Sequence, residues 1–346
     1  MRAVVCGLMA LITPLAGCTM GDTVRGTPEG VAGSAAGGAA GRAADSTVGA
    51  AAGGAAGTTT AGAAPVGRAG VAVPPVYAPS PPCVLKYPDT RASRAARTRL
   101  QHDLARYVAQ QPGRVVFGAH DLATGLRLGH HAHESGMITA SGSKVDILAA
   151  LLQRRHRLTG GEHDLAARMI RESDNAAADA LWSRVGGGYG MGGFYRRAGL
   201  RETVPGPSRF WGGTNTSPAD RLRLLRLLAE GGGGLRAAER RLVLGLMGRV
   251  QHDQAWGVSA AARPGDRVAL KNGWTPRPFM HNTWAVTSYG RITGPGRDLL
   301  LAVQTDYQPG EGRGIQAIEG LSDLVGRRLG DLRQVTVRAC PAAPTP

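Results

Sequence analysis

The 346-residue sequence predicts an α+β fold, with an antiparallel sheet flanked by helices and an all-helical subdomain inserted between the parts of the sheet. Three observations support this fold class. Short apolar runs typical of strands begin before residue 130, helix-period segments follow over 141–250, and strand patterns return after residue 263. A last amphipathic stretch, GIQAIEGLSDLVGRRL, closes the folded part, and the sequence has no internal repeat.

The first 18 residues predict an export signal. MRAVVCGLMALITPLAGC has an apolar run from Ala3 to Leu15, which is shorter than the roughly 20 residues that cross a bilayer. The run ends in Leu-Ala-Gly-Cys, which is similar to the lipobox of bacterial lipoproteins and implies acylation of Cys18 after cleavage. The alternative is an ordinary secretory peptide with a chance cysteine. We expect an exported protein, anchored by lipid to the outer face of the bacterial cytoplasmic membrane.

Three further segments complete the expected organisation. Residues 19–82 are rich in Ala, Gly, Thr and Pro and offer little apolar surface for a core, so we expect a disordered tether. Residues 83–340 form the folded domain, and residues 341–346 are a short tail.

The cysteines suggest one structural disulfide. Cys6 leaves with the signal, and Cys18 is the expected lipid acceptor. The two that remain, Cys83 and Cys340, stand at opposite ends of the domain, and we expect them to pair in an oxidising compartment.

The chain carries a formal net charge of +16, nearly all of it in the domain, because acidic and basic residues balance in the tether. One interpretation of this charge is attraction to anionic headgroups or wall polymers. The favoured interpretation is an arginine-rich composition without a charged partner. Export and an aromatic content of only 5% disfavour a nucleic-acid partner. We expect a monomer.

The domain begins with a helix and a hairpin. Residues 92–111 place Leu100 and Leu104 at helical spacing before a Pro-Gly stop. Two apolar runs, Val115–His120 and Leu126–Gly129, surround the turn sequence DLATG. Helices are then expected in SKVDILAALLQ, HDLAARMIRESDNAAADALWSRV, SPADRLRLLRLLAE and LRAAERRLVLGLMGRV, separated by Gly-rich breaks, and strands in DRVALKN, TWAVTSYGRI and DLLLAVQTDY.

Lysine is rare in this chain: 41 residues are Lys or Arg, and only Lys86, Lys144 and Lys271 are lysines. Lys144 lies three residues after Ser141, so both share the apolar face of a helix at its first turn. A serine there is explained as an N-cap. A cation is not, because it opposes the helix dipole and loses hydration. A neutral lysine can accept the proton of the serine hydroxyl, which an arginine cannot do.

Lys271 is the candidate for a second cation that lowers the pKa of Lys144. It precedes Asn272-Gly273, a pair typical of hairpin turns, so a tight hairpin with an edge lysine is the alternative. Pro276 would remove a donor from the return strand of such a hairpin. We therefore expect the strand to run through Gly273 to Trp274 and to end in a loop.

Ser173-Asp174-Asn175 interrupts a helical run and, taken alone, is a loop or cap tripeptide. In order, however, S-x-x-K, S-D-N and K-x-G resemble the signature set of penicillin-binding proteins and class A β-lactamases, over roughly residues 86–336. The resemblance implies the β-lactamase/transpeptidase fold, a serine acyl-enzyme, and neither metal nor cofactor.

The resemblance also implies roles for individual residues. Ser141 would be the nucleophile, Lys144 its proton acceptor, and Ser173 the relay to the leaving nitrogen. Asn175 and Lys271 would bind the substrate's side-chain amide and its carboxylate, and the backbone N–H groups of Ser141 and Trp274 would form the oxyanion hole. Asn272 stands where β-lactamases usually have Thr or Ser and would give the carboxylate an amide contact beside Gly273.

Two departures from the family concern turnover and the shape of the cleft. The interval between the first two motifs is short, which implies a trimmed helical subdomain. Class A enzymes place a deacylating glutamate in an E-x-x-L-N context, whereas Glu202, in ETVPG, is the only carboxylate in the equivalent segment here. We expect rapid acylation of Ser141 and slow deacylation.

GHHAHE, with His130, His131, His133 and Glu134, could hold a divalent metal, but three histidines on a loop favour a solvated turn. The leading hypothesis is thus a lipid-anchored serine hydrolase acting on a β-lactam or a cell-wall peptide amide. The alternative is a non-catalytic surface lipoprotein that binds wall peptides or anionic polymers.

Overall fold

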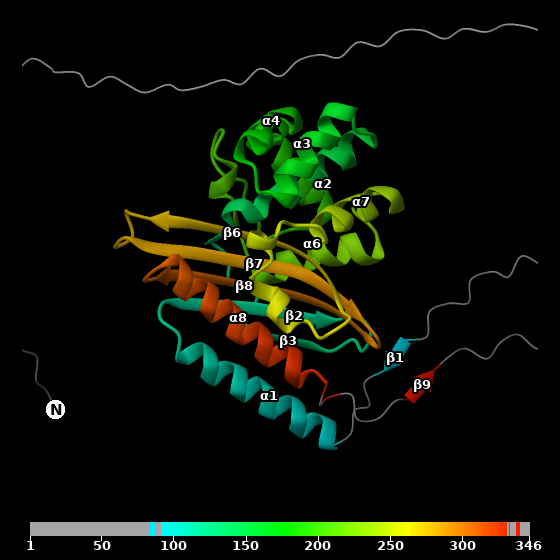
Figure 1. The fold of residues 1–346 in the computed structure, drawn as a ribbon, viewed down its shortest axis with the longest axis vertical. Coiled ribbons are helices and arrows are strands. Elements are labelled where there is room, and N and C mark those ends of the chain that lie inside the picture. Colours follow the sequence, from blue (N-terminus) through cyan, green and yellow to red (C-terminus); the bar gives the residue numbers. More distant parts are fainter. Residues whose placement is uncertain (1–83, 87–90, 331, 333–336, 340–346) are drawn as a thin grey trace, which may run out of the picture. The chain divides into compact units, whose positions relative to one another are not determined.

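A computed structural model describes residues 84–86, 91–330, 332 and 337–339 (Figure 1). The chain divides into a unit of residues 1–74 and a unit of residues 75–346, and every described residue belongs to the second. The predicted signal, lipid acceptor Cys18, tether and tail, and both cysteines of the predicted disulfide, Cys83 and Cys340, lie outside the described residues. No helix in the described part is long and apolar enough to cross a membrane.

A five-stranded antiparallel sheet forms the centre of the domain, in the order β3-β2-β8-β7-β6. The hairpin predicted before residue 130 supplies one edge, and the strand that carries Lys271 supplies the other. The strands are β2 (Arg114–Asp121), β3 (Arg127–His130), β6 (Arg267–Arg277), β7 (Thr283–Gly294) and β8 (Arg297–Gln308). Two small antiparallel pairs add β1 (Val84–Lys86) with β9 (Val337–Ala339) and β4 (Met137–Ile138) with β5 (Asn215–Thr216).

Helices α1 (Arg91–Ala109) and α8 (Glu311–Arg328) cover one face of the sheet, and the helical subdomain lies on the other (Figure 1). Alternation within the strands explains this layering, because successive side chains point to opposite faces and both faces of β7 and β8 are apolar and buried. One core cluster lies between the sheet and the α1/α8 layer, and a second fills the helical side.

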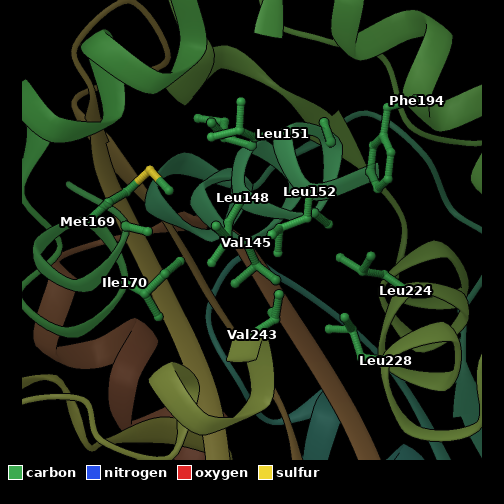
Figure 2. Close-up of a cluster of buried hydrophobic side chains, with 14 of the residues drawn as sticks. Val145, Leu148, Leu151, Leu152, Met169, Ile170, Phe194, Leu224, Leu228 and Val243 are labelled. Carbon is green, nitrogen blue, oxygen red and sulfur yellow. The ribbon is translucent and has the colours of Figure 1, made fainter. Parts of the chain in front are cut away.

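The helical subdomain is built around α2 (Ser143–Arg155), whose first ten residues are all buried. Figure 2 shows side chains of α2 such as Val145 and Leu148 packed against residues of the surrounding helices. Those helices are α3 (Gly160–Arg171), α4 (Asn175–Val185), α5 (Gly187–Ala198), α6 (Pro218–Glu230) and α7 (Ala237–Met247). A helix that is buried all round belongs in the middle of a bundle, so α2 is fixed firmly at its N-terminal end.

Side-chain caps set where several helices begin. The Thr159 hydroxyl accepts from the Glu162 amide while the Glu162 carboxylate accepts from the Thr159 amide, which makes a capping box at the start of α3. Asp174 caps α4 by accepting from the Ala177 amide at 2.9 Å. The S-D-N tripeptide therefore does form a cap, and it separates α3 from α4 inside a predicted single helical run.

Two expectations about these elements are wrong. The glycine-rich stretch after α4 was expected as a break, yet it forms α5, because Met191, Phe194, Tyr195 and Ala198 give it a buried helical face. The strand with Lys271 does not end at Trp274 but continues to Arg277. Pro276 is tolerated there because β6 is an edge strand, which can lack a donor on its open side.

Candidate active site

Ser141 lies on a single 3-10 turn, η1 (Ala140–Gly142), that leads directly into α2. Ala140 has a φ of +45°, which is costly for a residue with a Cβ and recurs at functional sites. Two hydrogen bonds hold the turn: the Ser143 hydroxyl donates to Ala140 O at 2.9 Å, and the Tyr289 hydroxyl donates to Gly142 O at 2.7 Å. The backbone around Ser141 is therefore anchored both to α2 and to β7.

The Lys144 amine lies at the centre of a group of oxygens. Lys144 Nζ is 3.0 Å from Ser141 Oγ and 2.8 Å from Asn175 Oδ1. It is also 3.1 Å from Ser173 Oγ and 2.5 Å from Ser173 O. The predicted pairing of Ser141 with Lys144 on one helix face agrees with this geometry, and S-D-N contributes the remaining oxygens.

Ser173 connects the two lysines. Its Oγ lies 3.1 Å from Lys144 Nζ and 3.1 Å from Lys271 Nζ, and Lys271 Nζ also donates to Asn272 O at 3.0 Å. Ser173 has a φ of +58°, the second strained non-glycine backbone in the cluster. Three segments distant in sequence, at residues 141, 173 and 271, thus bring four polar groups into one chain of hydrogen bonds.

Both lysine side chains are fully buried. Burial, the largest effect, lowers the pKa of Lys144 to about 7, although the carboxylates of Asp174 and Asp179 act in the opposite direction. Burial and the nearby charge of Lys144 lower the pKa of Lys271 to about 7. A neutral amine beside Ser141 is therefore accessible near neutral pH.

The hydroxyl groups lie closer to the surface than the amines. Ser141 and Ser173 are partly exposed, and Asn175 is exposed at the first turn of α4. A ligand that approaches from solvent would meet the Ser141 hydroxyl, the Ser173 hydroxyl and the Asn175 amide first, with both amines beneath them. This order suits a site in which protons move between buried amines and solvent-facing hydroxyls.

Gly273 brings β6 against the nucleophile turn. A Cβ at this position would lie 2.3 Å from Thr139 O and 2.8 Å from the backbone nitrogens of both Ser141 and Gly142. Only glycine fits such an approach, and it carries the Trp274 backbone alongside the turn. The Trp274 side chain contacts Trp256, with ring centroids 5.8 Å apart. Only the backbone N–H of Trp274 would therefore contribute to the predicted oxyanion hole.

Asn272 is not brought into the cluster. Its side chain is fully buried, and Nδ2 donates to Gln254 O at 2.9 Å and to Trp256 O at 3.0 Å. Both amide hydrogens are used, and successive residues of a strand point to opposite faces, so Asn272 faces away from the side on which Lys271 meets Ser173. Its amide ties β6 to the loops behind it instead of facing a ligand.

Trp211, on η2 (Trp211–Gly213), completes the surroundings of Lys144, and sequence reasoning missed it. Lys144 Nζ lies 4.6 Å from the centroid of the indole ring, and the indole N–H donates to Asp179 Oδ1 at 2.7 Å. The residue comes from a loop without periodicity, so no pattern pointed to it.

Glu202 lies outside the cluster. It contacts His133 Nδ1 at 2.8 Å and accepts from the Ser217 hydroxyl at the start of α6. His131 and Arg114 contact Glu134 instead. Within the part of the chain that the structure describes, no group of three or more His, Cys, Asp or Glu side chains is placed to hold a metal ion.

Residues 162–329 match the family described as the β-lactamase enzyme family. The chain is also 28% identical over 203 residues to proteins of Mycobacterium tuberculosis and Mycobacterium bovis that carry the provisional lipoprotein name LppW. That match covers 55% of this chain and 62% of those relatives, so this chain matches less than two thirds of their length.

Solved structures share the fold. PBP-A superposes with a TM-score of 0.58 and 22% identity over 68% of this chain and 97% of its own. A class A β-lactamase from Mycobacterium abscessus gives 0.57 and 23%, over 67% and 99%. A PBP-A variant, with a TM-score of 0.58, 22% identity and the same coverage as PBP-A, is titled as an acyl-enzyme complex with penicillin G. The predicted fold class and the resemblance given by the three motifs are confirmed.

Proposed function

We propose that this chain is a serine acyl hydrolase with Ser141 as nucleophile, and its match to the β-lactamase enzyme family over residues 162–329 and its fold support the proposal. One observation carries the proposal: the buried amine of Lys144, with a pKa of about 7, lies 3.0 Å from Ser141 Oγ. A lysine in this state is a general base that can activate a hydroxyl.

In the acylation step, Ser141 Oγ attacks the carbonyl carbon of an amide and its proton passes to neutral Lys144 Nζ. The backbone N–H groups of Ser141 and Trp274 receive the oxyanion, and such donors are typically worth about 10²- to 10³-fold in rate. The carbon–nitrogen bond then breaks, and the leaving nitrogen takes a proton through Ser173 Oγ, with Lys144 the source of that proton. An ester on Ser141 remains.

Substrate contacts follow from the same cluster. Charged Lys271 would attract a substrate carboxylate, and exposed Asn175 would hold a side-chain amide. A β-lactam or a peptidoglycan-type amide has both groups beside a carbonyl, so we propose one of these as substrate. The PBP-A variant solved as a penicillin G acyl-enzyme makes the β-lactam the practical probe.

Slow deacylation is part of the proposal. The charged groups that act on the Lys144 pKa are Asp174 and Asp179, and each is already in use, Asp174 as the α4 cap and Asp179 by the Trp211 indole. Glu202 is tied to His133 and Ser217. No carboxylate in the described residues makes a hydrogen bond to Ser141, so a deacylating water molecule would lack a carboxylate base beside the ester.

Export, lipid attachment at Cys18 and a Cys83–Cys340 disulfide are proposed as well. The lipoprotein name of the mycobacterial relatives supports the first two. For the disulfide, β1 pairs with β9 so that Val84 is opposite Ala339. In the sequence, Cys83 directly precedes Val84 and Cys340 directly follows Ala339. Mass spectrometry of unreduced peptides tests the bridge, and two free thiols would exclude it.

Labelling with a fluorescent penicillin tests the catalytic proposal. We expect the purified protein to form an adduct that persists on the gel, and the Ser141→Ala variant to form none. An adduct that disappears while the penicillin is hydrolysed would indicate a β-lactamase. Absence of any Ser141-dependent adduct would exclude penicillin acylation and favour a non-catalytic lipoprotein that binds wall peptides.

A further inference from the structure

Three arginines converge on one hollow of the helical subdomain. Arg154, near the end of α2, and Arg196 and Arg197, near the end of α5, line a cavity of about 620 Å³. We call it the arginine cavity. Its lining includes neither aspartate nor glutamate, and among the described residues none of the three guanidinium groups forms an ion pair with a carboxylate.

Neutral groups hold two of these arginines in place. Arg154 Nη1 donates to Val185 O at 3.3 Å, and Arg197 Nε donates to Gln153 Oε1 at 2.7 Å. Gln153 is itself fixed, because its Nε2 donates to Gly233 O. Carbonyl oxygens orient the guanidinium groups without cancelling their charge, so the positive field of the cavity is retained.

Glycines give the cavity an open floor. A Cβ at Gly193 would lie 3.2 Å from Arg197 Nη1, and one at Gly186 would lie 3.7 Å from Arg154 Nη1. The Arg197 guanidinium therefore lies close to the backbone of α5 at Gly193, and Arg154 is in ordinary contact range of Gly186, the residue before α5. Tyr189, 92% exposed, stands at the rim and adds an aromatic ring to the cationic surface.

Like charges repel, so three cations around one hollow favour an external anion. Their planar forks present more N–H donors than the two oxygens of one carboxylate can accept, whereas a phosphate group offers three oxygens and a higher charge. We propose that the arginine cavity binds phosphate groups. It shares no residue with the Ser141 cluster, and the proposal is independent of the catalytic one.

Two sources of phosphate can be separated by experiment. Inorganic pyrophosphate, titrated calorimetrically at fixed ionic strength, represents a free phosphate compound. Phosphatidylcholine vesicles with and without phosphatidylglycerol represent a membrane surface. The ratio of the affinities for the two kinds of vesicle removes any contribution of a lipid anchor. We expect binding to at least one probe, weakened by more than about tenfold in the triple variant Arg154→Gln/Arg196→Gln/Arg197→Gln.

A second arginine-lined hollow provides the matched control. Arg241, Arg249, Arg267 and Arg291 line it, again on a glycine-containing surface. Arg291 pairs with Asp298, but no hydrogen bond in the described residues anchors the guanidinium groups of the other three. The triple variant Arg241→Gln/Arg249→Gln/Arg267→Gln removes the same charge and should change binding by less than about twofold. Circular dichroism must show that both variants fold.

The outcomes are distinct. Pyrophosphate binding lost only in the first variant identifies a soluble phosphate ligand, and phosphatidylglycerol binding lost only there identifies a headgroup site. Equal losses in both variants would mean that net charge alone causes binding and would overturn the proposal. Failure of the wild-type protein to bind either probe would overturn it too.

Discussion

Lys144 and Asp146 lie two residues apart on α2, and both are fully buried, yet only Asp146 contacts a group of opposite charge. Asp146 Oδ1 accepts from Arg221 Nη1 at 2.6 Å, both side chains are inaccessible to solvent, and the Tyr195 hydroxyl donates to Asp146 Oδ2 at 3.1 Å. Lys144 contacts only neutral oxygens and an indole ring.

This difference distinguishes a charged group that stabilises the fold from one that is suited to proton transfer. Burial, the largest effect, raises the pKa of Asp146, whereas the charge and hydrogen bond of Arg221 lower it. The ion pair joins elements, and Arg221 also donates to Thr216 Oγ1 of β5 at 3.1 Å. A buried amine without a contacting carboxylate has a lowered pKa and can exchange its proton near neutrality. Within one helical turn, α2 therefore carries an ion pair that fixes the helix and the amine that we propose as the base.

Replacing the base should give the largest effect. We expect Lys144→Met to slow acylation of Ser141 by about 10³-fold or more, because among the described residues only Lys144 makes a hydrogen bond to the Ser141 hydroxyl. The free energy of unfolding of this variant should not fall, because the substitution removes a desolvated cation. Intact-protein mass spectrometry of the penicillin adduct gives the rate, and urea unfolding gives the stability. Unchanged acylation would contradict the assignment of Lys144 as base.

Replacing the paired carboxylate should do the reverse. We expect Asp146→Asn to lower the free energy of unfolding by about 3–5 kcal/mol, because Arg221 is left buried without its counter-charge. Urea unfolding measures the change.

The double variant Asp146→Leu/Arg221→Met is the control, since it removes both charges and should recover most of the loss. If Asp146→Asn costs less than about 1 kcal/mol, the contrast between the two charges of α2 is wrong.

The pH dependence of acylation tests both lysines together. Lys144 must be neutral, so the rate should rise as pH increases toward about 7, its pKa, by about tenfold per unit below it. Lys271 must be charged to hold a carboxylate, so the rate should fall above about 7, the pKa of that amine. A bell-shaped profile centred near neutral pH is expected from stopped-flow acylation, and a rate that is flat from pH 5 to pH 9 would oppose it.

Much of the site could be predicted from the sequence because its parts are local. Ser141, on the turn η1, and Lys144, in the first turn of α2, are three residues apart, a spacing that sets their contact. The rarity of lysine in this arginine-rich chain drew attention to Lys271 as well. Ser173 needed the family resemblance, because a cap tripeptide gives no sign that it will meet a lysine nearly a hundred residues later.

The parts that could not be predicted depend on tertiary packing. Trp211 reaches Lys144 from a loop, and Tyr289 reaches Gly142 from a strand in which many positions are equally apolar. The helix α5 did carry a signal in the spacing of Met191, Phe194 and Tyr195, but its glycines, poor helix formers, outweighed that signal. The direction of the Asn272 side chain depends on the face that β6 presents, which a motif does not specify.

Trp211 offers the finest test of how the charge of Lys144 is set. Its ring attracts the protonated amine by roughly 0.5–2 kcal/mol while its bulk keeps water away. Leucine at this position would keep much of the bulk and lose the attraction, so Trp211→Leu should lower the pKa of Lys144 further, by about 0.5–1 unit. The acid limb of the acylation profile would then move to lower pH by that amount while the alkaline limb, set by Lys271, stays in place. A shift of the acid limb to higher pH would mean that leucine admits water to the amine, and that shielding by the indole outweighs its attraction for the cation.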